Sequence, residues 1–201
     1  MKVGLYFGSF NPIHIGHLII ANHLVDHSDL QQIWFVISPH NPHKEKNTLL
    51  EDYHRLALVH EAIEDNPNFR ASDVEFKLEQ PNYTVKTLMV LKQRYPNYEF
   101  ELIMGEDNLR TLTKWYNYSY ILEHFKIRVY PRAYDSLQKV NETPLPEELV
   151  NHPNIIMVLD TPTMNLSSSH IRKMIAAKKD VRYLIPEKVW KYIDKMGFYG
   201  A

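Results

Sequence analysis

The sequence predicts an α/β fold built on a doubly wound, mostly parallel sheet of about six strands. Short apolar runs alternate along the chain with longer segments whose apolar residues recur at helical spacing. The apolar runs are continuous, which is typical of strands that helices cover on both faces. No internal repeat or low-complexity tract divides the 201 residues. We therefore expect a single domain over residues 1–201.

The expected strands are short runs of apolar, β-branched and aromatic residues. In chain order they are Val3–Phe7, Ile33–Ile37, Val74–Phe76, Phe100–Met104, Ile127–Tyr130 and Ile155–Leu159. The third of these runs is the weakest, because a glutamate interrupts it and predicts partial exposure.

The expected helices lie between these runs and carry apolar residues three or four positions apart. They are His17–Leu24, Leu56–Ile63, Thr84–Tyr95, Ile171–Ala177 and Val189–Met196. Prolines and polar residues predict long connections over 39–47 and 135–153. Ligands of open α/β sheets bind beyond the carboxyl ends of the strands, so we expect functional residues just after strands.

Composition excludes several classes of protein. The chain has 23 Lys and Arg against 24 Asp and Glu, a net charge of −1. It therefore lacks the basic surplus of a general nucleic-acid binder. Without cysteine, the chain forms no disulfide and offers no thiolate nucleophile or metal ligand. The longest apolar runs have five residues, glycine aside, whereas a membrane span needs about 20. We expect a cytoplasmic protein without a membrane or nucleic-acid partner.

A glycine- and histidine-containing segment follows the first expected strand. It reads Gly8–Ser9–Phe10–Asn11–Pro12–Ile13–His14–Ile15–Gly16–His17. Gly8 allows a tight turn, and the two histidines lie at the start of a helix, where N–H groups and the helix dipole favour an anion. Either histidine alone would suggest a turn or cap residue, but the strand, glycine turn and helix start together favour phosphate chemistry.

A zinc site is a weaker alternative for the histidines. His23 and His27 are four residues apart, but no carboxylate or cysteine completes a ligand set. We expect these two histidines to face solvent.

A second helix start lies after the last expected strand, at Ser167–Ser168–Ser169–His170–Ile171–Arg172. Serine is a preferred N-cap, and Arg172 one turn later presents a planar fork of donors. A plain N-cap with a surface arginine would explain this segment by itself. Paired with the first segment, it predicts a clamp for pyrophosphate.

Both segments resemble motifs of the nucleotidyltransferase superfamily. His14–Ile15–Gly16–His17 is similar to its [HT]-x-G-H motif, and Leu166–Arg172 to its I-S-S-T-x-I-R motif. Further segments resemble the bacterial nicotinate mononucleotide adenylyltransferases of that superfamily. They are Pro42–His43–Lys44, Arg55, Asn82–Leu88, Met104–Asp107, Leu112–Tyr116 and Pro131–Arg132. The resemblance implies a Rossmann-like fold and adenylyl transfer from ATP, with Mg²⁺, to nicotinate mononucleotide.

The resemblance also implies roles for individual residues. The catalytic residues would be His14, His17, Lys44 and Arg172, and the residues binding ATP would be Gly8, Ser9, Phe10, Asp107, Ser167, Ser168 and Ser169. The mononucleotide would contact Asn41, Thr84, Trp115 and Arg132. No protein ligand for a metal is expected, and the chain could form a homo-oligomer.

Other functions are alternatives to adenylyl transfer to nicotinate mononucleotide. Asn11 stands where bacterial members often have aspartate, and a G-S-F-N-P form occurs in eukaryotic nicotinamide mononucleotide adenylyltransferases. A pantetheine-phosphate adenylyltransferase would be shorter, and a cytidylyltransferase would leave the Trp115 segment unexplained. A nucleotide-binding regulator without activity is disfavoured because both phosphate motifs keep their polar residues.

Overall fold

The computed structural model describes residues 1–39, 49–131 and 144–201. The strands are β1 (Lys2–Gly8), β2 (Gln32–Ile37), β3 (Phe69–Ser72), β4 (Glu99–Gly105), β5 (Ile127–Tyr130) and β6 (Ile155–Met157). The α-helices are α1 (Ile15–Asp26), α2 (Asp52–Ile63), α3 (Thr84–Arg94), α4 (Glu106–Leu109), α5 (Tyr118–His124), α6 (Ser168–Ala176) and α7 (Glu187–Met196). Short 3₁₀ helices are η2 (Val74–Lys77), η3 (Leu112–Lys114), η4 (Glu147–Leu149) and η5 (Phe198–Gly200).

The six strands form one sheet in the order β3-β2-β1-β4-β5-β6, and every pair is parallel. The predicted doubly wound α/β sheet is confirmed. The order reverses direction between β1 and β4, and the crevice beyond such a switch point is where open α/β sheets bind ligands.

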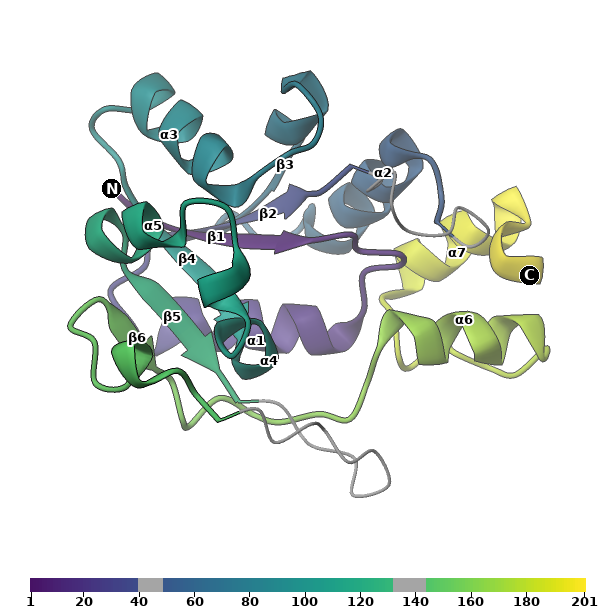
Figure 1. Ribbon diagram of the computed structural model, residues 1–201. Helices are drawn as coiled ribbons and strands as arrows, with labels where there is room; N and C mark the ends of the chain where they lie inside the picture. The colour runs from purple at the N-terminus through teal and green to yellow at the C-terminus, as the bar shows by residue number, and fades with distance from the viewer. Residues whose placement is uncertain (40–48, 132–143) are drawn as a thin grey trace.

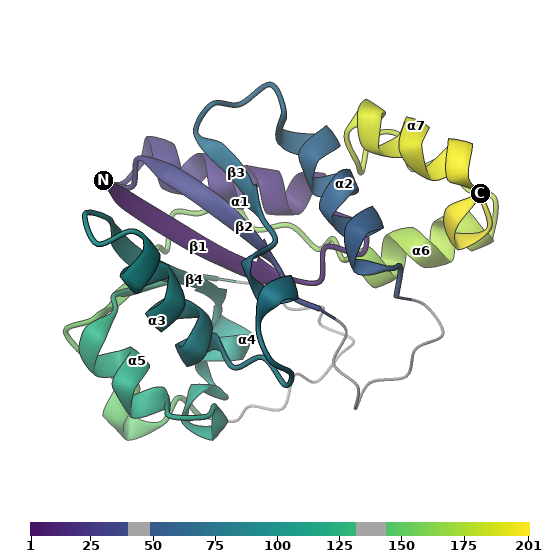
Figure 2. The ribbon, with the colours of Figure 1, turned by 90° about the horizontal axis from the view of Figure 1, so that it is seen from above.

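Side chains on the two faces of the sheet form two separate cores. Tyr6 and Phe35 face α1, α2, α6 and α7, whereas Leu5 and Trp34 face α3 and α5. Figure 2 shows α1 on one side of the strands and α3 and α5 on the other. Helices α6 and α7 extend past the carboxyl end of β1 (Figure 1). The continuous apolar strands are thus explained by burial on both faces.

Two sequence expectations about secondary structure are wrong. The strand expected at Val74–Phe76 is the 3₁₀ helix η2, and Phe69–Ser72 forms the edge strand instead. Buried Glu75 bonds to α3 from η2, a tertiary contact that overrides the local β preference. The last strand ends at Met157, because the chain turns where Thr161 N–H bonds to the Val158 carbonyl. Leu159 is therefore 73% exposed.

His23 also differs from expectation, since its side chain is buried while His27 is exposed. The two rings stack with centroids 4.2 Å apart, and His23 Nε2 lies 3.3 Å from Asp160 Oδ1. Within the described ranges, no group of three or more His, Asp or Glu side chains could hold a metal ion. In the same ranges, no helix is both long and apolar enough to cross a membrane.

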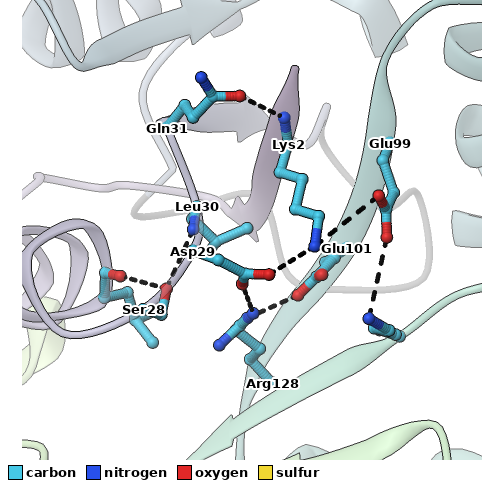
Figure 3. A network of polar contacts seen from close by, with 10 residues as sticks. Lys2, Ser28, Asp29, Leu30, Gln31, Glu99, Glu101 and Arg128 are labelled. Carbon is cyan, nitrogen blue, oxygen red and sulfur yellow. Dashed lines mark hydrogen bonds and ion pairs between the residues drawn. The ribbon is translucent and has the colours of Figure 1, made fainter.

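A buried ion pair links β4 and β5 away from the carboxyl ends of the strands (Figure 3). Arg128 Nε lies 2.5 Å from Glu101 Oε2, and both side chains are buried. Arg128 also pairs with Asp29, which accepts a 2.5 Å hydrogen bond from Lys2 Nζ. This bond lowers the pKa of Asp29. The network ties the starts of β1 and β4 to β5 and to the loop between α1 and β2.

We predict that Arg128→Met lowers the free energy of unfolding by about 3–5 kcal/mol, because it leaves Glu101 as a buried charge without its partner. Urea denaturation measures the loss. The double variant Arg128→Met/Glu101→Leu should recover most of it, since the buried charge is then gone as well. Lys2→Met, which removes only a partly exposed member, should cost far less stability than Arg128→Met. A double variant as unstable as Arg128→Met would contradict this account.

Candidate active site

The site is built on the loop that follows β1 at the switch point of the sheet. Phe10 in this loop has a φ of 45°, and its ring is buried against His17, Phe35 and Tyr6. A Cβ on Gly8 would meet the Phe10 ring at 2.9 Å. Glycine is therefore needed at position 8 for the Phe10 ring to pack against the end of β1. Phe10 is a predicted ATP-binding residue. Its side chain belongs to the core, so only its backbone can contact a ligand.

His14 and His17 meet at the start of α1. His14 is the N-cap residue, and its backbone N–H donates to His17 Nδ1 over 3.2 Å. The two rings stack with centroids 3.7 Å apart. A Cβ on Gly16 would lie 3.0 Å from His14 Nδ1, so glycine at this position leaves room for the His14 ring.

This cap decides the tautomer of the neutral His17 ring. Because Nδ1 accepts a hydrogen bond, the ring carries its proton on Nε2. The Nε2–H group is the donor that His17 can present to a phosphate oxygen. A neutral donor makes this bond without the tight hydration of an ammonium ion.

The structure brings the second predicted segment against the first, although they are more than 150 residues apart in sequence. Ser168 Oγ donates to the Pro12 carbonyl over 2.8 Å, and Arg172 Nη1 donates to the Asn11 carbonyl over 2.7 Å. Arg172 Nη2 also donates to Ser169 Oγ over 3.2 Å. Ser167 caps α6 by accepting the His170 N–H. Its hydroxyl therefore performs the ordinary capping role.

Arg55, at the start of α2, supports the same loop from the other side. Its fully buried guanidinium donates from Nη1 to the carbonyls of Ser9 and Ser38, over 2.7 and 2.8 Å. It also bonds to the Leu50 carbonyl and pairs with Asp52. Burial lowers the pKa of Arg55. The sequence singled out Arg55 only through the family resemblance, and nothing in the sequence predicts that it joins the ends of β1 and β2.

Three carbonyl groups of the loop are thus turned toward donors from α2 and α6. The C=O and the following N–H of a trans peptide unit point in opposite directions. The Phe10 N–H therefore points away from Arg55, and the Ile13 N–H points away from Ser168. A backbone N–H group turned away from such a donor can serve as a hydrogen-bond donor to an anion.

A second group of predicted residues lies beyond β2 and β4. Thr84 is the first residue of α3, and Asp107 lies in the first turn of α4 after β4. Trp115 is half-buried against the core that faces α3 and α5. The rings of Tyr83 and Tyr116, which flank Thr84 and Trp115 in sequence, lie 4.5 Å apart. The structure therefore brings the Thr84 and Trp115 segments together, while Asn41, Lys44 and Arg132 lie outside the described residues.

Glu75 is a buried carboxyl group that the sequence did not single out. It accepts a 2.8 Å hydrogen bond from Thr87 Oγ1 of α3, and Ser38 also bonds to it. Burial raises its pKa, an effect that these hydrogen bonds only partly oppose. Since the Ser38 carbonyl also accepts from Arg55, a continuous set of contacts runs from α3 to the loop after β1. A signal was present in the sequence, since Glu75 interrupts an apolar run.

Comparison with known proteins places the chain among relatives of one kind. The family model described as cytidylyltransferase-like matches residues 5–174. A probable nicotinate-nucleotide adenylyltransferase of Flavobacterium psychrophilum is 54% identical, over 99% of each chain. A protein of the same name from Flavobacterium johnsoniae is 55% identical, again over 99% of each chain.

Among solved structures, the chain is similar to the Plasmodium falciparum nicotinic acid mononucleotide adenylyltransferase complexed with NaAD. The TM-score is 0.75 at 19% identity, and the match covers 98% of this chain and 97% of that one. At this identity the likeness concerns the fold, and it confirms the Rossmann-like arrangement expected from the sequence.

We predict that Glu75→Gln makes the stability of the protein less dependent on pH. The raised pKa means that the folded state holds the Glu75 proton more tightly than the unfolded state. Stability is therefore lost as the pH rises from the ordinary glutamate range through the raised value. The variant, which cannot ionise, should gain stability over the wild type with rising pH.

Thermal unfolding between pH 4 and pH 8 measures this difference. Glu79→Gln, which changes an exposed carboxylate four residues away, is the matched control and should follow the wild type. A Glu75→Gln variant less stable than the wild type at pH 8 would show that the ionised carboxylate is needed for the fold.

Proposed function

The chain belongs to the cytidylyltransferase-like family, and we propose that it transfers the adenylyl group of ATP to nicotinate mononucleotide. The products are deamido-NAD and pyrophosphate, in NAD biosynthesis. The contact of α6 with the loop after β1, through Ser168 and Arg172, carries the proposal. It unites two phosphate-binding segments at the switch point of the sheet, and the relatives are named for this activity.

The reaction requires the positioning of two anions more than acid–base catalysis. An oxygen of the mononucleotide phosphate attacks the α-phosphorus of ATP, and the bond from that phosphorus to the bridging oxygen of pyrophosphate breaks. The attacking phosphate is already an anion at neutral pH, so no general base removes a proton. The protein lowers the barrier by orienting the phosphates and stabilising the charge that develops on them.

The two segments have complementary roles in this mechanism. His17 donates from Nε2 to the α-phosphate, beside the stacked His14 ring, and backbone N–H groups of the loop after β1 are proposed to contribute further donors. Arg172 and Ser169 hold the β- and γ-phosphates, because the guanidinium fork at the start of α6 matches phosphate oxygens. Lys44 is proposed to contribute a further positive charge.

Mg²⁺ enters this proposal with ATP, as part of the substrate. In the described part of the chain, no cluster of carboxylates and histidines could hold a metal ion by itself. Mg²⁺ binds few protein ligands, keeps several waters and uses substrate phosphates as ligands. This fits a site rich in phosphate donors. When bound, the ion would neutralise part of the triphosphate charge.

The mononucleotide would lie toward α3, α4 and the Trp115 segment. Thr84 begins α3, so its N–H groups and hydroxyl provide donors for a carboxylate. Trp115 offers an aromatic plane for the pyridine ring. Localisation in the cytoplasm and the formation of a homo-oligomer stay predictions from the sequence.

We predict that His17→Asn lowers kcat by about 10²–10³, the loss typical of one transition-state donor. Asparagine keeps an oxygen that can accept the His14 N–H at the start of α1, and it removes the Nε2–H group. Steady-state kinetics with ATP and nicotinate mononucleotide measure the effect. His60→Ala, on the exposed face of α2, should leave kcat unchanged. A folded His17→Asn variant with native turnover would exclude His17 from the chemistry.

We also predict that kcat/KM is at least tenfold higher for nicotinate mononucleotide than for nicotinamide mononucleotide. A pocket of donors leaves the amide NH₂ of nicotinamide unpaired, at a cost of about 1–3 kcal/mol. The assay follows pyrophosphate release with ATP and a panel that includes phosphopantetheine. Equal values, or a preference for the amide, would refute the assigned acceptor while leaving adenylyl transfer intact. An absence of turnover with every acceptor would refute the proposed function.

A further inference from the structure

The last residues of the chain are docked beside the phosphate-binding segments. The 3₁₀ helix η5 follows α7 and packs against α6, and Figure 2 shows the C-terminus next to both helices. Lys178 Nζ donates to the Gly200 carbonyl over 2.5 Å, and the Phe198 ring lies 4.6 Å from the His54 ring of α2. The segment is thus held between α2 and α6, the two helices that support the loop after β1.

Tyr199 in this segment reaches the loop directly. Its hydroxyl donates to Asn11 Oδ1 over 2.6 Å, across 188 residues of sequence. Its φ of 59° lies in the left-handed region, which is strained for a residue with a Cβ. Burial raises the pKa of Tyr199, although the charges of Arg172 and Arg55 oppose that shift. The hydroxyl therefore stays protonated and acts as a donor at neutral pH.

Asn11 connects this bond to the phosphate-binding machinery. Its side chain is buried, and Oδ1 also accepts the Leu50 N–H over 3.3 Å. Its backbone carbonyl accepts the bond from Arg172 Nη1. Asn11 therefore bonds to the C-terminal segment through its side chain and to α6 through its backbone. The bonds to Oδ1 restrain the Asn11 side chain and, through its Cα, the backbone whose carbonyl accepts from Arg172.

We infer that Tyr199 is a positioning residue for ATP binding: through Asn11 it fixes the loop carbonyl that orients the Arg172 guanidinium. This inference rests on the proposed function, in which Arg172 holds the β- and γ-phosphates. The last turn of the chain is then part of the ATP site, although Tyr199 itself touches no substrate. Tyr199 acts by limiting the positions that the loop and the arginine can adopt before ATP arrives.

Tyr192 provides a matched control in the same region. Its hydroxyl lies 3.0 Å from His54 Nδ1, and burial also raises the pKa of Tyr192. Its bonding partner is His54 of α2, whereas that of the Tyr199 hydroxyl is Asn11. We expect the removal of the Tyr192 hydroxyl to disturb the packing of the C-terminal region and to leave the bonds at Asn11 intact.

The experiment measures the Kd for ATP by titration calorimetry, together with kcat and both KM values. Tyr199→Phe should weaken ATP binding about five- to tenfold, the effect of one lost hydrogen bond, and should leave KM for the mononucleotide unchanged. Tyr192→Phe should match the wild type. Native ATP affinity in a Tyr199→Phe variant, with or without a lower Tm, would overturn the inference.

A double-mutant cycle tests whether Tyr199 acts through Arg172. Arg172→Lys keeps the charge and loses the fork, and we expect it to weaken ATP binding about tenfold. In that background Tyr199→Phe should cost less than it does alone, because the guanidinium that it orients is gone. Losses that multiply would refute the coupling. Calorimetry needs no acceptor, so the result stands apart from a failure of adenylyl transfer in the wild type.

Discussion

The buried guanidinium of Arg55 is the contact on which the site depends. Adjacent parallel strands end side by side, and the loops that leave them present carbonyl groups without partners from the sheet. Arg55 satisfies the Ser9 carbonyl after β1 and the Ser38 carbonyl after β2 with one nitrogen. A buried charge is costly unless its donors are used, and here Leu50 and Asp52 complete the set. These hydrogen bonds offset the cost of burying the guanidinium charge, and they fix the loops after β1 and β2 at the same time.

Once the ends of β1 and β2 are fixed, the remaining elements attach to the same few atoms. Arg172 and Ser168 bring α6 to the carbonyls of Asn11 and Pro12. Ser38 bonds to Glu75, which in turn bonds to α3. The loop is thereby connected to the helix where the mononucleotide is proposed to bind. The proposed phosphate and pyridine ends of the site therefore share one support. Reactions that depend on the relative position of two anions benefit from such rigidity.

The sequence predicts the parts of this structure whose signals are local. Continuous apolar strands such as Ile33–Ile37 and the motif around His14 have patterns that stand alone, and both lie where expected. The edge strand Phe69–Ser72 alternates apolar and polar residues over four positions only, and the neighbouring run Val74–Phe76 matches a strand pattern more closely. The short helices α4 and α5 lack a repeated apolar spacing and were not predicted. The His23 side chain contacts Asp160 in the segment after β6, a long-range contact that the sequence of α1 does not predict.

Long-range contacts account for what the sequence could not predict in the site. Phe10 lies in a motif associated with ATP, yet the direction of its ring depends on the φ of 45° and on the core residues beneath it. The bond between Tyr199 and Asn11 joins residues that show no pattern in common. Arg55 is one arginine among many until the fold places the carbonyls of Ser9 and Ser38 around it.

The spacing of the two motif histidines follows from helix geometry. In a capping box the N-cap side chain can accept the N–H of the third helical residue, and the side chain of that third residue can accept the N-cap N–H. His14 and His17 occupy these two positions, so one nitrogen of His17 completes the start of α1 while the other carries the proton. Gly16 is required between them because a Cβ there would meet the His14 ring. The same imidazole thus stabilises the helix start and acts as the donor toward phosphate, which explains why the chemistry is located at this turn of the chain.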